Sequence, residues 1–436
     1  MTRRRTGSHS LVVFLLLIPL LHGVLGRLGS GRGRLPQALL PVGKADAAEG
    51  GTDTRELYAD AAERERALRY NRTREWLVLA GLAWNGVLSL LALATGFSAW
   101  LRDRATQVAP RRLGAAIPYT FAATLLSTLA SLPLSFYSSY TLEHRYGLST
   151  QTRRGWFADE VKGFGVGSAL ALPLVQTAYW IIRRFPRWWW AVLSGLIVPL
   201  TVLLANLAPV LIMPLFNKFE PLRDQALAER IRALAATQGV TVSDVLQMDM
   251  SRRTRKANAL FTGVGNTKRI VLGDTLLDEF TPDEVEVVLA HELGHQVHRD
   301  LWKLIGLGTA TTVGTSYLVH RLAGPLIARL GPRFGLDIRR GVEDVATLPL
   351  LGLLLGLVSL VLTPLQNAFS RNLIERPADH FALELTGKHE AFVSAMEKLG
   401  RMNLADPNPP ALIRYLLYSH PPLQERIDYA IARRRM

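Results

Sequence analysis

The sequence Leu289-Ala290-His291-Glu292-Leu293-Gly294-His295 is an HExxH motif. On a helix, histidines four residues apart lie on one face, where both imidazoles can bind the same zinc ion. Glu292 follows the first histidine and is placed to accept a proton from the attacking water. The helical segment Thr281–His298 begins with a Thr-Pro-Asp cap. The motif therefore predicts a zinc-dependent peptidase, against the alternative of a surface helix with two unrelated histidines.

A catalytic zinc site needs a third protein ligand and leaves one position for water. The longer HExxHxxGxxH pattern is absent, because His298 and Leu301 occupy its last two defined positions. A distant glutamate is the remaining common choice, and Glu375 in Ser370–His380 is the best candidate. Asp379 lies four residues later on the same helix face, where it can orient a ligating imidazole. From spacing alone, an ordinary salt bridge at Glu375 stays open.

Long apolar segments surround this motif in a chain of 436 residues that is 49% hydrophobic. Several contain no charged residue or histidine and reach the roughly 20 residues that cross a bilayer as a helix. They are Trp76–Leu101, Ala115–Leu142, Gly163–Ile182, Trp188–Phe216 and Val345–Ser370. Leu304–Val319 is shorter, but Lys303 and Arg321 at its ends can reach the interface. Buried helices of a soluble protein would give apolar runs of about 10–14 residues.

A further apolar segment, Leu11–Leu21, follows Arg3-Arg4-Arg5 and predicts a signal anchor or a signal peptide. Between the spans, Val245–Met250 and Arg269–Leu272 have strand composition, and Asp224–Gln238 has helical periodicity. We therefore expect a mostly α-helical polytopic membrane protein with about seven spans. Its zincin-like catalytic domain contains helices and a small β element, and is split by two spans.

The chain divides by composition into six parts. They are 1–27, a signal anchor or signal peptide; 28–57, a flexible linker; 58–216, an amino-terminal membrane domain; 217–303, the first part of the catalytic domain with HExxH; 304–370, a transmembrane pair; and 371–436, the second part of the catalytic domain with the third ligand.

The net charge of +15 would suggest nucleic acid in a soluble protein. Here arginines gather in short loops between spans, where they set topology and contact lipid headgroups. Examples are Arg102, Arg104, Arg111, Arg112, Arg183, Arg184 and Arg187. We expect the lipid bilayer as a partner and no nucleic acid. The sequence has no cysteine, which excludes thiol catalysis, disulfides and cysteine-ligated metals.

Several motifs together resemble the type I CAAX prenyl protease family of integral-membrane zinc peptidases. HELGH at 291–295 is followed by E-x-x-x-D at 375–379. Further similar stretches are Pro214–Phe219 with Pro221-Leu222, Asn258–Gly263 with Arg269–Leu272, Ser419–Arg426, and Glu143–Gln151. The likeness runs from about residue 58 to the end of the chain, whereas the first 57 residues show no clear match beyond an initial span.

The resemblance implies roles that spacing alone does not give. It implies Glu375 as the third ligand of one zinc ion per chain, and spans arranged around an intramembrane chamber. It implies that Asn258 binds the substrate backbone, and that His420 and Arg426 contact the substrate or the developing oxyanion. A donor opposite the metal is what a tetrahedral intermediate needs. We expect His298, His320 and His380 to be structural.

The expected substrate is a peptide or protein, possibly one associated with the membrane. The family name describes prenylated carboxyl-terminal motifs, but quality control of non-prenylated membrane proteins is an alternative that analogy does not decide. An inert polytopic chaperone would be expected to lose a ligand or the base, and all are present. A transporter would carry ionisable residues within its spans, which the apolar segments between 76 and 216 lack.

The distribution of arginines between the two sides of the membrane barely favours either side for the catalytic domain. Arginines in the loops 102–114, 183–187 and 320–344 lie on one side of the expected topology. Those in 58–75 and 143–162 lie on the catalytic side, and the two sets are close to balanced. Because the resemblance implies a cytosol-facing site, we expect the catalytic side in the cytoplasm, at the cell membrane if the protein is bacterial.

Overall fold

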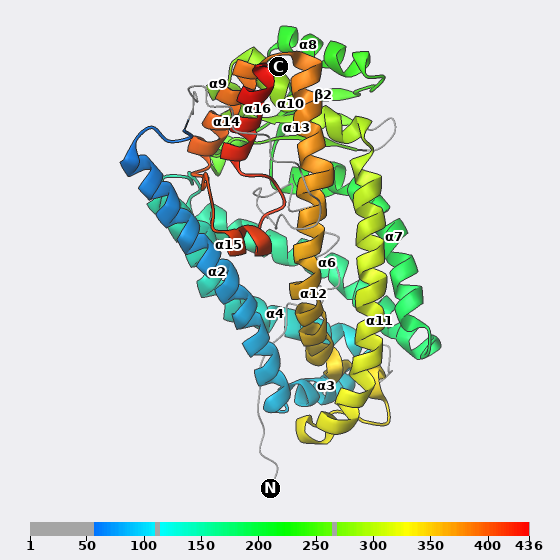
Figure 1. Cartoon of the computed structure of the whole chain (residues 1–436). Helices are drawn as coiled ribbons and strands as arrows, with labels where there is room; N and C mark the ends of the chain where they lie inside the picture. The colour runs from blue at the N-terminus through cyan, green and yellow to red at the C-terminus, as the bar shows by residue number, and fades with distance from the viewer. Residues whose placement is uncertain (1–55, 110–113, 264–267, 436) are drawn as a thin grey trace.

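The computed structural model describes residues 56–109, 114–263 and 268–435, which form a small domain on top of long helices (Figure 1). The lower part contains α2 (Ala61–Ala94), α3 (Phe97–Val108), α4 (Ala116–Ser135), α5 (Leu142–Arg145), α6 (Arg153–Arg184), α7 (Trp189–Leu207), α11 (Asp300–Phe334) and α12 (Leu348–Ser370). The segments Leu11–Leu21 and 28–55 of the expected anchor and linker lie outside the described residues. Leu57, at the linker's expected end, is buried and would collide with any side chain at Gly400.

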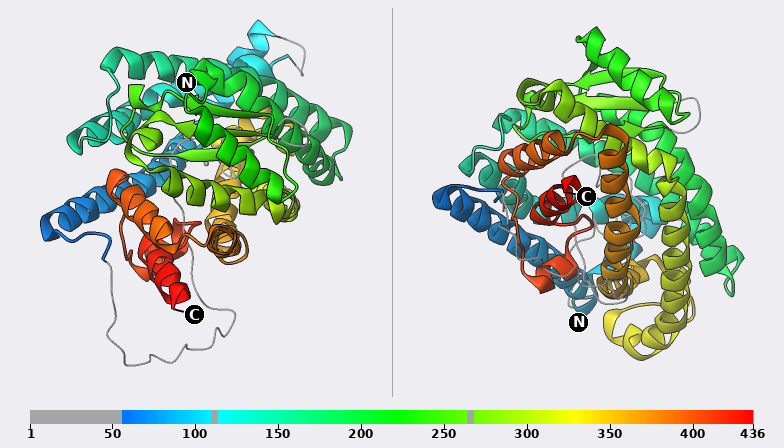
Figure 2. Two further views of the ribbon diagram at one scale, coloured as in Figure 1. Left: turned by 90° about the horizontal axis from the view of Figure 1, so that it is seen from above. Right: turned by 45° about the horizontal axis from the view of Figure 1, so that its top comes forward.

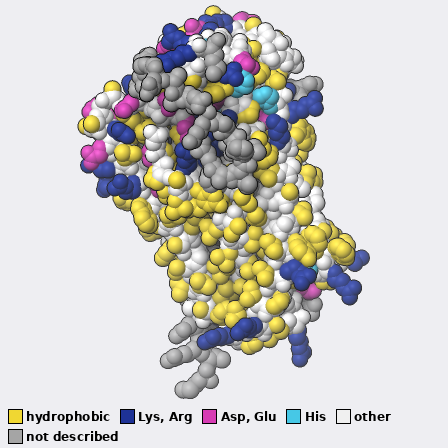
Figure 3. Space-filling model, viewed as in Figure 1, with side chains coloured by type: hydrophobic (Ala, Val, Ile, Leu, Met, Phe, Trp, Pro, Cys, Tyr) yellow, Lys and Arg dark blue, Asp and Glu magenta, His cyan; other side chains and the backbone are white. Residues whose placement is uncertain are grey.

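The long helices form a closed ring. Each of α2, α4, α6, α7, α11 and α12 packs against the next, and α12 packs back against α2. Figure 3 shows hydrophobic side chains over the waist of this ring, and Lys and Arg at its lower end. An apolar belt with charged ends is the surface that a bilayer requires. The chamber that the resemblance implies stays a prediction.

Five helical stretches among the described residues are long and apolar enough to cross a membrane. They are Ala61–Ala94, Ala116–Arg145, Arg153–Arg184, Trp189–Leu215 and Val345–Thr386. The expected span Leu304–Val319 lies within α11, which is not among these five, so the count of seven stays a prediction. The span expected over Trp76–Leu101 was given the wrong end at Leu101. The helix ends at Ala94, because Gly96 takes a left-handed conformation with φ of 68° and α3 then begins a new direction.

The upper domain holds a mixed four-stranded sheet in the order β1-β2-β4-β3. Its strands are β1 (Phe219–Pro221), β2 (Asp244–Met248), β3 (Ala259–Thr262) and β4 (Arg269–Gly273). β2 and β4 are parallel, while β1 and β3 pair antiparallel with them at the two edges. The two strand predictions are confirmed. β3 is an edge strand and packs against the HExxH helix.

Helices complete the upper domain, with α16 lying beside α14 (Figure 2). They are α8 (Gln225–Thr237), α9 (Asp274–Glu279), α10 (Pro282–Val297), α13 (Arg376–Thr386), α14 (His389–Met402) and α16 (Leu423–Arg434). The short helix α15 (Ala411–Leu416) lies below them and packs against α12 (Figure 1). The prediction of helices over 224–238 and 281–298 is confirmed. α10 leads directly into α11, and α12 runs through a π-helical segment, Arg371–Glu375, into α13.

α10 and α13 approach closely at Gly294. A Cβ atom there would lie 3.2 Å from the Ala378 Cα and 3.1 Å from Phe381 Cδ1. The phenyl ring can shift, but the backbone of α13 cannot without separating the two helices. Glycine at this position therefore sets how closely the two helices pack.

We predict that Gly294→Ala destabilises the protein by roughly 1–3 kcal/mol through overpacking. The melting temperature of the detergent-solubilised protein should fall, and its metal affinity should fall with it. Gly306→Ala is the matched control, because Gly306 is also helical and nothing lies within 4 Å of its added Cβ. Equal melting temperatures for the two variants would contradict the prediction.

Candidate metal centre

The HExxH helix begins with a capping box. The Glu284 backbone N–H donates to Thr281 Oγ1 at 3.4 Å, and the Thr281 N–H donates to Glu284 Oε2 at 2.7 Å. Pro282 occupies the first helical position, where its missing N–H costs nothing. The predicted start of the helix is confirmed. This cap fixes the register that carries His291 and His295 into the buried middle of α10.

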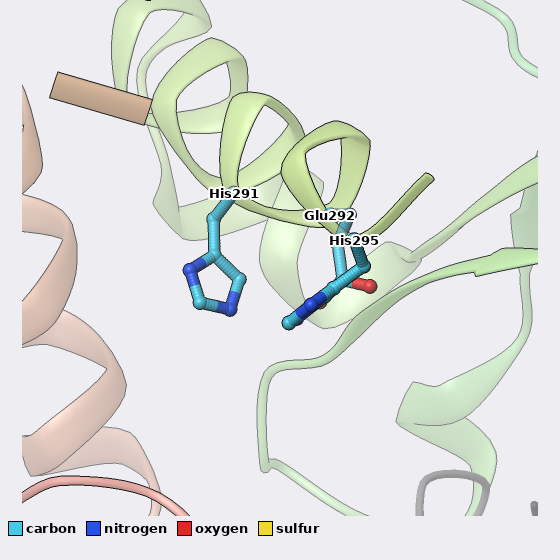
Figure 4. Close-up of side chains that lie close together, drawn as sticks. All are labelled: His291, Glu292 and His295. Atoms are coloured by element: carbon cyan, nitrogen blue, oxygen red, sulfur yellow. The ribbon is translucent and has the colours of Figure 1, made fainter. Parts of the chain in front are cut away.

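Both imidazoles project from the same side of α10, with the Glu292 carboxylate beside His295 (Figure 4). His291, Glu292 and His295 each offer one ligand atom within 4.8 Å of the others. His291 and His295 are 7% and 6% exposed, whereas Glu292 is less buried. The motif therefore brings together a possible metal site and a carboxylate that solvent can reach.

Glu375 joins this group from the π-helical segment between α12 and α13. It ends the π-helical segment and is 1% exposed. Its Oε2 lies 3.4 Å from His291 Nε2 and 3.8 Å from His295 Nε2. The contacts of this oxygen within the described part of the chain are with histidines, whereas spacing alone had left open a salt bridge with Lys or Arg. The groups that face it are imidazoles, including His420 at 3.1 Å.

The two separations of Glu375 Oε2 from the imidazole Nε2 atoms are close to those of a tetrahedral metal site. Ligand bonds of about 2.1 Å at a tetrahedral angle put neighbouring donor atoms roughly 3.4 Å apart. Glu375 Oε2 lies at this separation from His291 Nε2, at 3.4 Å, and slightly farther from His295 Nε2, at 3.8 Å. Two imidazoles and one carboxylate also leave a fourth position open. The residues present therefore fit a divalent metal ion.

Each imidazole contacts a carboxylate through its Nδ1 atom. The Nδ1 atom of His291 lies 2.8 Å from Asp379 Oδ1, as the sequence suggested for Asp379. The Nδ1 atom of His295 lies 2.9 Å from Asp300 Oδ2, a partner that the sequence analysis missed. Such contacts favour the proton on Nδ1 and leave Nε2 for a metal. Both rings are therefore oriented toward Glu375.

Asp300 reaches His295 through the turn at Arg299, which joins α10 to α11. Arg299 has a φ of 55°, a left-handed conformation that is uncommon for residues other than glycine. Asp300 is fully buried, and its second oxygen accepts a hydrogen bond from Lys303 Nζ at 2.8 Å. The only sequence signal was an aspartate just after the helix that carries the motif.

The pKa of His291 reflects these contacts. Burial disfavours the charged imidazolium, but hydrogen bonds from the ring to Asp379 and Glu375 outweigh burial and raise its pKa to about 9. A metal ion must displace this proton. Metal affinity therefore falls as the pH drops below that pKa.

The remaining expected site residues lie around this centre. Arg426 donates from Nε and Nη2 to the two oxygens of Asp379 at 2.8 and 2.5 Å, and is 9% exposed. The structure thus gives Arg426 a partner within the protein, and its expected contact with the substrate or the oxyanion stays a prediction. The His420 side chain is 39% exposed and lies at the open edge of the centre. Asn258 precedes β3, and its carbonyl accepts a hydrogen bond from the Gly273 N–H at 3.0 Å.

The three histidines expected to be structural have contacts outside the centre. His298 packs edge-on against Phe381, and His320 packs edge-on against Trp189. His380 Nε2 lies 3.3 Å from a Glu384 oxygen. These contacts are consistent with a structural role.

Comparison with known proteins assigns the chain to a family. The family described as "CAAX prenyl protease N-terminal, five membrane helices" matches residues 54–218, and peptidase family M48 matches residues 221–434. The chain belongs to the CAAX prenyl protease family of M48 peptidases. The resemblance noted in the sequence is confirmed, and this protein is an integral membrane metallopeptidase.

Individual relatives agree with this assignment. An uncharacterized metalloprotease of Bacillus subtilis, YhfN, is 32% identical over 366 residues, which is 84% of each chain. CAAX prenyl protease 1 of Saccharomyces cerevisiae is 33% identical over 318 residues, which is 69% of each chain. The crystal structure of S. mikatae Ste24p has the same fold, with a TM-score of 0.78 and 22% identity over 96% of this chain and 98% of that one. The predicted fold class is confirmed.

We predict that Asp300→Asn weakens divalent-metal affinity by about 10–100-fold, as loss of a carboxylate behind a ligating imidazole does. Affinity can be measured by competition with a chromogenic chelator. Asp278→Asn, at an exposed aspartate on α9, is the control for charge and should bind metal as the wild type does. Unchanged affinity in Asp300→Asn would mean that helix packing alone orients His295.

Proposed function

We propose that this protein is a zinc-dependent endopeptidase of the membrane, with one Zn²⁺ held by His291, His295 and Glu375. The observation that carries the proposal is the convergence of two Nε2 atoms and one carboxylate oxygen, 3.4 and 3.8 Å apart. Two histidines and a glutamate are a known ligand set for catalytic zinc. The metallopeptidase family of the chain supports the same choice.

Zn²⁺, when bound, supplies Lewis acidity that polarises the scissile carbonyl and activates water near neutral pH. Glu292 is adjacent to His291 on α10 and lies outside the proposed ligand set. Its carboxylate accepts the proton of the attacking water and delivers it to the leaving amine. His420 is more exposed, and its Nε2 lies at the edge of the centre, where it can donate to the developing oxyanion.

We expect the backbone of the substrate to bind along strand β3. It is an edge strand that packs against α10, and within the described residues no strand pairs with its outer side. An extended peptide can add to such an edge by main-chain hydrogen bonds. Asn258, immediately before β3, is placed to bind the peptide where it leaves this edge. Arg426 acts by holding Asp379 behind His291.

The proposed substrates are peptides or membrane-associated proteins, processed in the manner of CAAX-box proteins. Relatives named CAAX prenyl protease match about two-thirds of the chain, which supports this class over general quality control of membrane proteins. The proposed domain division places the two parts of the catalytic domain, 217–303 and 371–436, around the transmembrane pair 304–370.

Two substitutions separate metal binding from proton transfer. Glu292→Gln should abolish peptide cleavage while zinc stays near one per chain, because this residue transfers a proton and is no ligand. Glu375→Ala should lose both zinc and activity. Zinc content by elemental analysis distinguishes the variants. Loss of zinc in Glu292→Gln, or full zinc in Glu375→Ala, would overturn the assignment of ligand and base.

His420→Phe should lower kcat by roughly 10²–10³ and leave the Michaelis constant nearly unchanged, the result expected for loss of an oxyanion donor. Steady-state kinetics on one peptide substrate provide the test. His380→Phe is the matched control, because its imidazole contacts Glu384 and lies outside the proposed centre. A change confined to the Michaelis constant would show that His420 only binds substrate.

We also propose that the catalytic domain faces the cytoplasm, as the near-balanced loop charges allow and the family favours. A reporter fused after Met436, on the catalytic side, should then be active only when it folds inside the cell. A reporter that is active only outside the cytoplasm would reject this orientation.

A further inference from the structure

The stretch Glu143–Gln151 begins within α5 and ends just before α6, so it belongs to the amino-terminal membrane domain. None of its residues takes part in the proposed catalytic centre. Its backbone nevertheless pairs with the catalytic domain. Ser149 and Thr254 form an antiparallel β-bridge, and the Arg255 N–H donates to the Leu148 carbonyl at 2.9 Å. A loop of the membrane domain therefore holds the segment of chain that leads into β3.

An ion pair joins the same two segments through their side chains. Lys256 Nζ lies 2.6 Å from Glu143 Oε2, and the two side chains are 18% and 15% exposed. The hydroxyl of Tyr70, which lies on α2 and is fully buried, donates to Glu143 Oε1 at 2.5 Å and accepts from Lys256 Nζ at 2.9 Å. Hydrogen bonds that involve a charged group are stronger than those between neutral groups, and removing one partner of a buried pair is costly. Three segments that lie far apart in the sequence therefore meet at one carboxylate.

This ion pair lies two residues before Asn258, which is proposed to bind the substrate backbone. The chain between them is also held from the side of the sheet. Thr275 Oγ1 donates to the Lys256 carbonyl at 2.8 Å, and the Gly273 N–H donates to the Asn258 carbonyl at 3.0 Å. Ala257, between the two, is buried. The start of β3 is thus fixed between the sheet on one side and the membrane domain on the other.

We propose that Glu143 is a positioning residue for substrate binding. Through Lys256 it holds Asn258 and the start of β3 in the conformation to which an extended peptide adds. The inference rests on the proposed peptidase function. A strand that is ordered before the peptide arrives lowers the entropy cost of binding. Because the strand binds the substrate and the transition state alike, loss of Glu143 should raise KM and leave kcat nearly unchanged.

The test uses the full-length, zinc-loaded protein in detergent micelles and a quenched fluorescent peptide that the wild type cleaves. A companion set of peptides carries one N-methyl group each, at successive backbone nitrogens away from the cleaved bond. In the wild type, N-methylation at a position that bonds to β3 should raise KM by about 3–10-fold, the effect of one lost hydrogen bond. Glu143→Gln should raise KM for the unmodified peptide about 10-fold, because a hydrogen bond to a charged group is lost. Its penalty for N-methylation should fall toward one, with kcat and zinc content unchanged.

A double-mutant cycle tests whether Glu143 acts through Lys256. Lys256→Met should raise KM as Glu143→Gln does, and the double variant should show no further rise, because the two residues act as a unit. Glu65→Gln is the matched control. Glu65 forms an exposed ion pair with Arg69 within α2, so its loss should leave KM at the wild-type value.

Several results would overturn the inference. An unchanged KM in Glu143→Gln would do so, as would additive effects of the two single substitutions. Melting temperature gives a second readout: a fall in melting temperature with the wild-type penalty for N-methylation would mean that the ion pair only stabilises the fold. If Glu143→Gln yields no folded protein, Tyr70→Phe decides, since it keeps the ring and loses only the hydroxyl. It should raise KM about 3-fold, and an unchanged KM would reject the inference.

Failure of this inference and failure of the proposed function give different results. If only the inference fails, the wild type and Glu143→Gln cleave the unmodified peptide with the same KM or lose N-methylation sensitivity in neither, and a chelator or Glu292→Gln abolishes the cleavage. If the proposed function fails, cleavage of the unmodified peptide is absent or survives in Glu292→Gln.

Discussion

The close approach of α10 and α13 is the constraint on which the catalytic centre depends. Two imidazoles come from one helix and a carboxylate from the start of the other, so the distance between the helices sets the distance between donor atoms. Gly294 permits this approach because its missing Cβ leaves room for the backbone of α13. Asp379 and Asp300 then orient the rings from behind. Backbone packing thus sets the position of the donor atoms. The buried carboxylates set the orientation of the imidazole rings.

Two of the long helices, α11 and α12, are joined to the two segments that carry the proposed ligands. α11 starts where the HExxH helix stops, and α12 continues through the π-helical segment toward Glu375. α11 and α12 also pack against one another within the ring. A π-helical turn contains an extra residue, which changes the direction in which the following side chains point. This segment therefore decides which residue of the helix faces the imidazoles.

Local patterns predicted the parts of the protein that local physics determines. The capped HExxH helix, strands β2 and β4 and the apolar spans each follow from spacing and composition within a short window. The pairing of Asp379 with His291 was foreseen because helical spacing placed it one turn from Glu375. Asp300 was missed, since it reaches His295 only through the left-handed turn at Arg299. The break at Gly96 and the contact of Arg426 with Asp379 also depend on conformation and on tertiary contacts, which a short window of sequence does not contain.

The division of the ligands between α10 and the segment before α13 has a further consequence. Residues 300–370 separate His295 from Glu375 along the chain and include helices of the ring. No continuous stretch of chain outside these helices contains all three proposed ligands. Limited proteolysis in the loops at the membrane surface therefore cannot release an active soluble fragment, as it can for peptidases joined to the bilayer by one terminal anchor. The proposed centre therefore stays in the plane of the membrane, together with the helices that carry its ligands.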